Sequence, residues 1–166
     1  MSKIISITAI ASVSPLGATS QTIWENYCNE KHCFTTHFLD HKETTVAKLD
    51  SVSEEVVSAL QHSDIKYKSL DKSVLYAMAA SRTAMQNAGW TSKDVFGINI
   101  GSSRGATDLF EKHHQDYLAT GKAQTLASPT TTLGNISSWV AHDLQSSGPE
   151  ISHSITCSTA LHAVLN

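Results

Sequence analysis

The sequence is poor in charge of either sign and in cysteine, and both shortages restrict what the chain can be. Its 166 residues hold 12 Lys and Arg against 15 Asp and Glu, a formal net charge of −3. It contains no long basic run, which argues against a nucleic-acid interface, because such an interface normally carries a basic patch. Three cysteines are a small and odd number, which argues against a disulfide framework and favours a protein of a reducing compartment.

Long apolar runs are also missing. No stretch approaches the roughly 20 apolar residues that a membrane-spanning helix needs. The N-terminal run from Ile4 to Val13 resembles a short signal peptide, but Ser6, Thr8 and Ser12 interrupt it at the spacing of a strand. We therefore expect a first strand there and a cytoplasmic protein. With 40% hydrophobic and 16% charged residues, the composition predicts one globular domain rather than disorder.

Hydrophobic periodicity predicts helices that alternate with strands. The clearest helix covers 70–88 and is followed by Gly89, a residue suited to a left-handed helix end. The other expected elements are a helix from Thr19 or Ser20 to Tyr27, a surface excursion over 30–68 with a helix near 53–60, a buried strand over 95–100, helices over 106–119 and 133–144, and a strand over 151–155. This alternation predicts an α/β layered fold.

Cys157 is the strongest candidate for chemistry. It lies between the expected strand 151–155 and the first turn of a helix, where the helix dipole favours an anion such as a thiolate. His162 follows at a helical spacing that turns its side chain about 140° away from Cys157. His153 can approach the thiol only through the tertiary fold. From spacing alone, Cys157 can also be a small buried thiol, since free cysteine is among the most buried residue types.

Several segments together resemble the N-terminal half of a β-ketoacyl-[acyl carrier protein] synthase, a condensing enzyme of the thiolase fold. The matching segments are the opening strand and turn over 7–17, the helix that ends in Ala88-Gly89, the glycine-rich strand end over 97–102, the Gly148-Pro149 pair that precedes Cys157, and the segment 158–162. The resemblance covers nearly everything except 30–68. It implies the N-terminal half of a thiolase-like layered α/β/α/β/α fold.

The resemblance implies a two-stage reaction at Cys157. The thiol takes an acyl group from an acyl carrier protein and forms a thioester. A malonyl carrier protein then loses carbon dioxide, and its carbanion attacks that thioester. The backbone N–H of Cys157 supplies one oxyanion donor in the family pattern. No metal or organic cofactor is implied.

The resemblance also places Arg104, Thr132 and Leu133 beside the acyl pocket. Relatives have small or apolar residues at the position of Arg104, so this side chain either shortens or polarises the pocket, or turns to solvent. Thr156 departs from the family as well, since alanine usually precedes the nucleophile. The segment 128–139 is more similar to ketosynthases of polyene pigment and polyketide pathways than to those of fatty acid synthesis.

The family needs groups that these residues do not supply. Its two catalytic histidines and second oxyanion donor lie in the C-terminal half, and none of the nine histidines here matches them. We therefore expect residues 1–166 to be the N-terminal ketoacyl-synthase domain of a longer protein, truncated after the nucleophile helix begins and unable to condense alone. The implied partners are an acyl carrier protein, acyl and malonyl thioesters, and a second subunit that meets the strand 151–155.

That second subunit is either a copy of this chain or a chain-length factor. A catalytically silent chain-length factor would have lost the cysteine, so Cys157 favours the active subunit. Two other functions remain open: a thiolase-fold enzyme that acts on coenzyme A thioesters, and a non-catalytic half-domain that binds a partner or carrier protein. Zinc-ligand residue types also occur near the N-terminus, without the paired Cys-x-x-Cys pattern, and we expect no metal there: Cys28, His32, Cys33 and His37.

Overall fold

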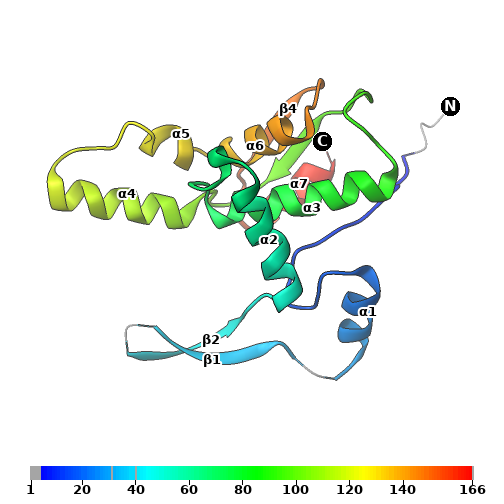
Figure 1. Ribbon diagram of the computed structural model, residues 1–166, viewed down its shortest axis with the longest axis horizontal. Helices are drawn as coiled ribbons and strands as arrows, with labels where there is room; N and C mark the ends of the chain where they lie inside the picture. Colours follow the sequence, from blue (N-terminus) through cyan, green and yellow to red (C-terminus); the bar gives the residue numbers. More distant parts are fainter. Residues whose placement is uncertain (1–4, 31, 40, 166) are drawn as a thin grey trace.

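The computed structural model describes residues 5–30, 32–39 and 41–165 (Figure 1). Its elements follow one another in this order: α1 (Ser20–Cys28), β1 (Phe34–Leu39), β2 (Lys42–Ala47), α2 (Ser51–Ser63), the 3-10 helix η1 (Ile65–Tyr67), α3 (Lys72–Ala88), β3 (Ile98–Gly101), α4 (Thr107–Thr120), α5 (Ala127–Thr131), α6 (Asn135–Leu144), β4 (Glu150–His153), the 3-10 helix η2 (Thr156–Ser158) and α7 (Thr159–Leu165). The expected mixture of helices and strands is confirmed.

Strands β3 and β4 pair in parallel, with Ile98 opposite Glu150 and Gly101 opposite His153. Helices α4, α5 and α6 lie between these strands in the sequence, which makes a crossover connection of the kind that parallel strands require. Because the pairing is parallel, the carboxyl ends of both strands lie at the same edge of the sheet. We call this the carboxyl edge, and β4 leads from it to Cys157.

The hydrophobic core lies between α2, α3 and α6, and α6 also contacts both strands. Its buried members are Val57, Leu60, Tyr67, Leu70, Val74, Leu75, Met78, Ala79, Ile136 and Val140. Asp71 caps the start of α3 by accepting the N–H of Ser73, and Gly89 ends this helix with a φ of 71°. The predicted helix over 70–88 is therefore confirmed, together with its left-handed glycine end.

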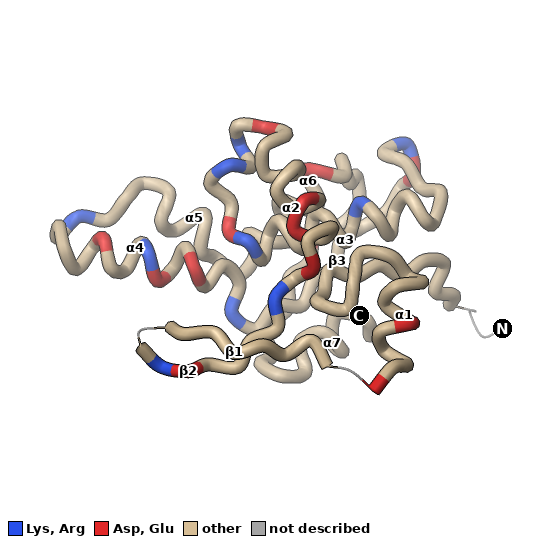
Figure 2. The backbone as a smooth tube through the Cα atoms, turned by 60° about the horizontal axis from the view of Figure 1, so that its bottom comes forward, with Lys and Arg blue, Asp and Glu red and all other residues tan. Residues whose placement is uncertain are grey.

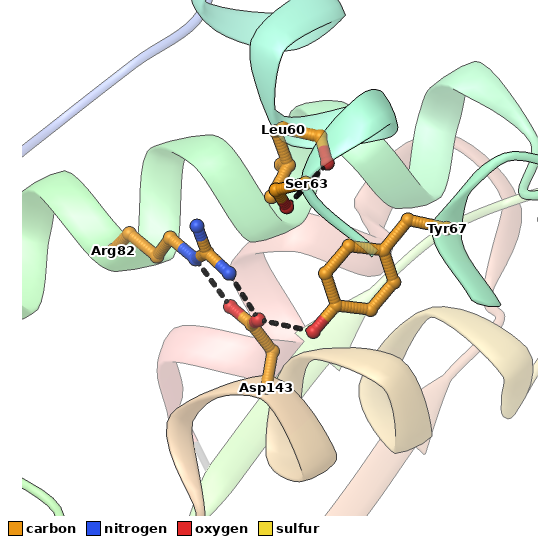
Figure 3. A network of polar contacts seen from close by, with 5 residues as sticks. All are labelled: Leu60, Ser63, Tyr67, Arg82 and Asp143. Carbon is orange, nitrogen blue, oxygen red and sulfur yellow. Dashed lines mark hydrogen bonds and ion pairs between the residues drawn. The ribbon is translucent and has the colours of Figure 1, made fainter. Parts of the chain in front are cut away.

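A buried carboxylate ties three of these elements together (Figure 3). Asp143 on α6 accepts hydrogen bonds from Nε and a terminal nitrogen of Arg82 on α3, at 2.7 and 2.6 Å. It also accepts the hydroxyl of Tyr67 on η1 at 2.8 Å. Burial raises the pKa of Tyr67, and its hydrogen bond to Asp143 raises it further. The same carboxylate raises the pKa of Arg82, chiefly through its hydrogen bonds.

The expected first strand from Ile4 to Val13 is wrong over its described part, while residues 1–4 lie outside the described residues. The segment 5–13 forms no strand, and Ile5 is 93% exposed. The described bridge nearest to it joins Ser14 to Gly17 in the turn that follows. Alternating side chains favour extended backbone, but a strand also needs a partner edge, and none of the described strands pairs with this segment.

The region 30–68 is more regular than its composition predicts. Strands β1 and β2 form an antiparallel hairpin in which Phe34 faces Ala47, and α2 covers and extends the helix expected near 53–60. The hairpin has no clear polar and apolar face because every residue of β1 is exposed. Without a buried face there is no alternating pattern for sequence analysis to detect.

The remaining expected elements are confirmed with shifted ends. Strand β3 starts three residues later than expected because Val95 is exposed. Helix α4 ends at Gly121, as predicted, with a φ of 68°. Helix α6 starts only at Asn135, so Leu133 belongs to the turn before it, and the short α5 was not predicted.

Charge is spread thinly over the described chain (Figure 2). Helix α4 carries both acidic residues and a lysine, whereas α7 has neither Lys, Arg, Asp nor Glu. Among the described helices, none is long and apolar enough to cross a membrane.

Candidate active site

The turn that carries Cys157 packs directly on β3. Strand β4 ends at His153, and the chain enters η2 with Cys157 as its middle residue before α7 begins at Thr159. A Cβ atom at Gly101 would lie 2.5 Å from the carbonyl oxygen of Thr159, so only glycine allows the two backbones to approach this closely. The glycine at the end of β3 therefore fixes where the Cys157 turn can lie.

A buried hydroxyl holds the turn in shape. Thr159 is 3% exposed, and its Oγ1 accepts the backbone N–H of Ile155 at 2.8 Å. The same hydroxyl donates to the carbonyl oxygen of Thr156 at 2.6 Å, so it bridges the two sides of Cys157. Sequence analysis did not give Thr159 this role. The pattern that reveals it is a hydroxyl residue two positions after a cysteine in a strand-to-helix turn.

Thr156 has left-handed backbone, with a φ of 48°. Left-handed backbone is a genuine outlier for a β-branched residue, and such outliers cost on the order of 1–3 kcal/mol when the surrounding structure imposes them. The two hydrogen bonds of the Thr159 hydroxyl, from the N–H of Ile155 and to the carbonyl oxygen of Thr156 itself, supply that constraint. The residue that sequence analysis marked as a departure from the family is therefore the strained residue of the turn.

Cys157 lies at the expected strand-to-helix junction, but in η2 rather than in the first turn of the α-helix. Its thiol is exposed, which does not fit the alternative of a small buried thiol. His153 is half-buried on β4, and its Nε2 atom has no hydrogen-bond partner among the described residues. His162 lies on α7.

The structure brings the loop that contains Arg104 next to the segment that contains Thr132 and Leu133. A Cβ atom at Gly105 would lie 3.5 Å from Cδ2 of Leu133 and 3.8 Å from the carbonyl oxygen of Thr132, which is ordinary contact distance. The resemblance places three residues beside the acyl pocket, and all three are exposed: Arg104, Thr132 and Leu133.

Hydrogen bonds join the Arg104 loop to the chain that approaches Cys157. The backbone N–H of Ser102 donates to the carbonyl oxygen of His153 at 3.1 Å. The hydroxyl of Ser154 donates to the carbonyl oxygen of Ser103 at 3.3 Å. The nucleophile candidate and the three pocket candidates therefore belong to one region around the carboxyl edge, which is where ligands commonly bind in sheets of this kind.

Several surface grooves lie away from Cys157. One apolar groove runs between the segment 10–12 and helices α1 and α3, and a second lies between the N-terminal segment, α3 and Phe96. A polar groove lies beside Asp143 and Glu150. None of these grooves, as the described residues form them, is lined by Cys157.

The cysteines and histidines near the N-terminus are spread over separate elements. Cys28 ends α1, and His37 lies in β1. The Cys33 thiol donates to the carbonyl oxygen of Pro15 at 3.4 Å, and the ring of His32 lies beside Phe34. Within the described ranges, no group of three or more His, Cys, Asp or Glu side chains is placed to hold a metal ion.

Comparison with known proteins gives this arrangement a family. The family model of the β-ketoacyl synthase N-terminal domain matches residues 2–166. The fold is similar to that of the ishigamide ketosynthase/chain length factor, with a TM-score of 0.72 and 17% identity over 89% of this chain and 39% of the other. It is also similar to a β-ketoacyl synthase from Burkholderia phymatum, with a TM-score of 0.75 and 20% identity over 95% of this chain and 41% of the other.

A search of curated proteins gave no match. The chain spans about 40% of the length of the two solved relatives, so the likeness concerns one part of those molecules. Over that part, the expected N-terminal half of a thiolase-like layered α/β/α/β/α fold is confirmed. The chain therefore belongs to the β-ketoacyl synthase family, as an instance of that family's N-terminal domain.

Proposed function

We propose that this chain is the nucleophile-bearing domain of a cytoplasmic β-ketoacyl-acyl carrier protein synthase. In the first step the Cys157 sulfur attacks the carbonyl carbon of an acyl thioester. A new carbon–sulfur bond forms at Cys157, the bond to the carrier sulfur breaks, and the carrier leaves as a thiol with the proton that Cys157 gave up. The backbone N–H of Cys157 is the proposed donor to the oxyanion of the intermediate.

In the second step a malonyl carrier protein loses carbon dioxide, and the resulting carbanion attacks the Cys157 thioester. Carbon–carbon bond formation releases the Cys157 thiolate and gives a β-ketoacyl carrier protein. This step depends on the two histidines of the family pattern, which these 166 residues do not supply. We propose that they belong to a further domain, and that the whole enzyme works in fatty acid or polyketide and polyene biosynthesis.

One observation carries the proposal. Cys157 presents an exposed thiol on a turn that is strained at Thr156, clamped by the buried hydroxyl of Thr159 and seated on Gly101. Strain concentrates at functional sites because the surrounding structure must stabilise it. A structural cysteine would need neither exposure nor a strained turn.

The oligomeric partner is part of the same proposal. One of the similar structures is the ishigamide ketosynthase/chain length factor. We propose that this chain pairs either with a second copy or with a chain-length factor, and that β4 lies at that interface. An exposed thiol at Cys157 supports the catalytic rather than the silent position in such a pair.

The test is the intact mass of the protein after incubation with an acyl carrier protein thioester, followed by peptide mapping. We expect one acyl adduct on Cys157, lost in Cys157→Ala. Cys28→Ala is the matched control, because Cys28 is also exposed but lies on α1, and it should retain the adduct. Absence of any adduct, or an adduct on Cys28 that survives Cys157→Ala, would contradict acyl transfer and favour a non-catalytic half-domain.

A second donor separates the proposed enzyme from a thiolase-fold enzyme of coenzyme A metabolism. The same acyl group is offered on coenzyme A and on the carrier protein. Faster labelling of Cys157 from the carrier protein supports the proposal. Faster labelling from coenzyme A would identify coenzyme A, and not the carrier protein, as the acyl donor. Cys157 would still be the nucleophile.

A further inference from the structure

Both arginines of the sequence are exposed, but they differ in whether a described carboxylate pairs with them. Arg82 forms a forked pair with Asp143 inside the core network. Arg104 is exposed in the loop between β3 and α4, and the structure gives it no ion pair with any described carboxylate. Arginine presents a planar fork of N–H donors that matches carboxylate and phosphate, so an arginine without an ion pair can bind such a group on a ligand.

The backbone around Arg104 is held in place. Gly105 has a φ of 68°, and its N–H donates to the hydroxyl of Ser102 at 3.0 Å. The hydroxyl of Ser73 on α3 donates to the carbonyl oxygen of Gly105 at 3.4 Å. The backbone next to Arg104 is therefore anchored through Gly105, while Arg104 itself is exposed.

Asp71 is connected to this loop through Ser73, but its carboxylate already accepts hydrogen bonds from other groups. Asp71 is 5% exposed, and one carboxylate oxygen accepts the N–H and the hydroxyl of Ser73. The other oxygen accepts the backbone N–H of Leu109 at 3.1 Å. Asp71 therefore caps α3 and binds the start of α4 instead of neutralising Arg104.

The Arg104 loop also borders the candidate active site. Residues 102 and 103 are hydrogen-bonded to residues 153 and 154, directly before the turn of Cys157. On its other side the loop contacts Leu133 through Gly105. Arg104 therefore places a positive charge beside the candidate site, although the formal net charge of the chain is −3.

We propose that Arg104 determines specificity by binding an oxyanion carried on the thioester substrate. The oxyanion is either a carboxylate at the far end of the acyl group or the phosphate of the carrier arm, since both accept the forked N–H donors of arginine. This inference rests on the proposed function, because it deepens the description of the substrate that acylates Cys157. It assigns Arg104 to recognition and not to bond making.

The first experiment separates the two sources of the oxyanion. Cys157 is acylated from hexanoyl and adipoyl thioesters of N-acetylcysteamine, which lack phosphate, and from hexanoyl phosphopantetheine. We expect at least one anionic donor to react roughly threefold to tenfold faster than the hexanoyl N-acetylcysteamine thioester, as for other electrostatically assisted encounters. A faster adipoyl donor identifies an acyl carboxylate, and a faster phosphopantetheine donor identifies the phosphate.

Arg104→Gln should abolish this preference and leave the rate with the neutral donor within about twofold. Lys93→Gln is the matched control, because Lys93 is an exposed cation in the loop before β3, away from the carboxyl edge. It should keep the preference. Equal rates for all three donors with the unchanged protein would overturn the inference, while the acyl adduct itself would leave the proposed function standing.

The second experiment does not require acyl transfer. The rates of alkylation of Cys157 by iodoacetate, an anion, and by iodoacetamide, its neutral analogue, are compared by peptide mapping. We expect Arg104→Gln to lower the ratio of the iodoacetate rate to the iodoacetamide rate at least roughly twofold, and Lys93→Gln to leave it unchanged. If no thioester acylates Cys157, the proposed function fails, and this ratio still decides whether Arg104 attracts anions to the thiol. An unchanged ratio would refute it.

Discussion

The core between α2, α3 and α6 and the carboxyl edge of the β3–β4 sheet use similar residues in opposite ways. In the core, Arg82 is paired with Asp143, and at the edge Arg104 has no acidic partner among the described residues. The core helix α3 ends in left-handed backbone at Gly89, whereas the edge places the same kind of backbone at Thr156. The core pairs its arginine and ends α3 with glycine, while the edge retains both an open charge and a strained β-branched residue.

This contrast separates the core, which we expect to determine the free energy of unfolding, from the carboxyl edge, where we propose that the chemistry takes place. Stability comes from apolar burial in the core, and the Asp143 network ties its three elements together. At the carboxyl edge, the close backbone approach at Gly101 and the hydrogen bonds of Thr159 hold the turn that carries Cys157. Substitutions in the core should therefore change the free energy of unfolding, and substitutions at the edge should change reactivity more than stability.

The largest expected effect on stability is at Leu75, which is 1% exposed in the core. Leu75→Ala should lower the free energy of unfolding by about 3 kcal/mol, because it removes buried apolar contacts and leaves a cavity. Leu161→Ala on α7, where the side chain is 61% exposed, should change it by less than about 0.5 kcal/mol. Urea unfolding of the three proteins measures both values, and equal losses at the two sites would abolish the contrast.

The next effect concerns the polar network of the core. Asp143→Asn should lower the free energy of unfolding by about 2 kcal/mol, because the ion pair with Arg82 is lost and an amide NH2, which cannot accept, replaces one of the two oxygens that accept from Arg82 and Tyr67. The loss is moderate because the Arg82 side chain is 45% exposed and water can solvate it. Glu111→Gln on the exposed surface of α4 is the control and should have almost no effect. A loss no larger than that of the control would mean that the network is not stabilising.

A smaller effect tests the two left-handed positions against each other. Thr156→Gly should raise the free energy of unfolding by about 1 kcal/mol, because glycine adopts a positive φ without strain. Gly89→Ala should lower it by about 1 kcal/mol for the converse reason. Thermal unfolding measures both shifts. Two shifts of the same sign would show that the Thr156 turn is not strained. The relaxed Thr156→Gly turn should also slow the acylation of Cys157.

The smallest effect is a pH dependence at Tyr67. Burial, and then the hydrogen bond to Asp143, hold the pKa of Tyr67 above its usual value of 10.0. The unfolded chain therefore loses this proton first as pH rises, so the stabilisation is complete below about pH 10 and declines above it. Urea midpoints between about pH 8 and pH 11 should fall less steeply for Tyr67→Phe than for the unchanged protein. Parallel profiles would contradict this origin of the dependence.

Much of the chain could be predicted because its patterns are local. The periodicity of 70–88, with Gly89 after it, determines α3 before any partner is known. The strand-to-helix junction at Cys157 could be located for the same reason. The hairpin of β1 and β2 could not, because its exposed strands show no alternation. The segment 5–13 misled in the opposite direction, since it alternates without forming a strand.

By itself, the sequence determined the α/β class, the helices α3, α4 and α6 and the strands β3 and β4, because capping residues, periodicity and spacing act over a few residues. It also predicts Cys157 as the cysteine most suited to chemistry. Only the tertiary structure decided that Thr159 clamps the turn of Cys157, that Thr156 bears its strain, and that the loop of Arg104 contacts Leu133 through Gly105. These properties depend on backbones that approach one another from distant parts of the chain. Local patterns carry no record of such approaches.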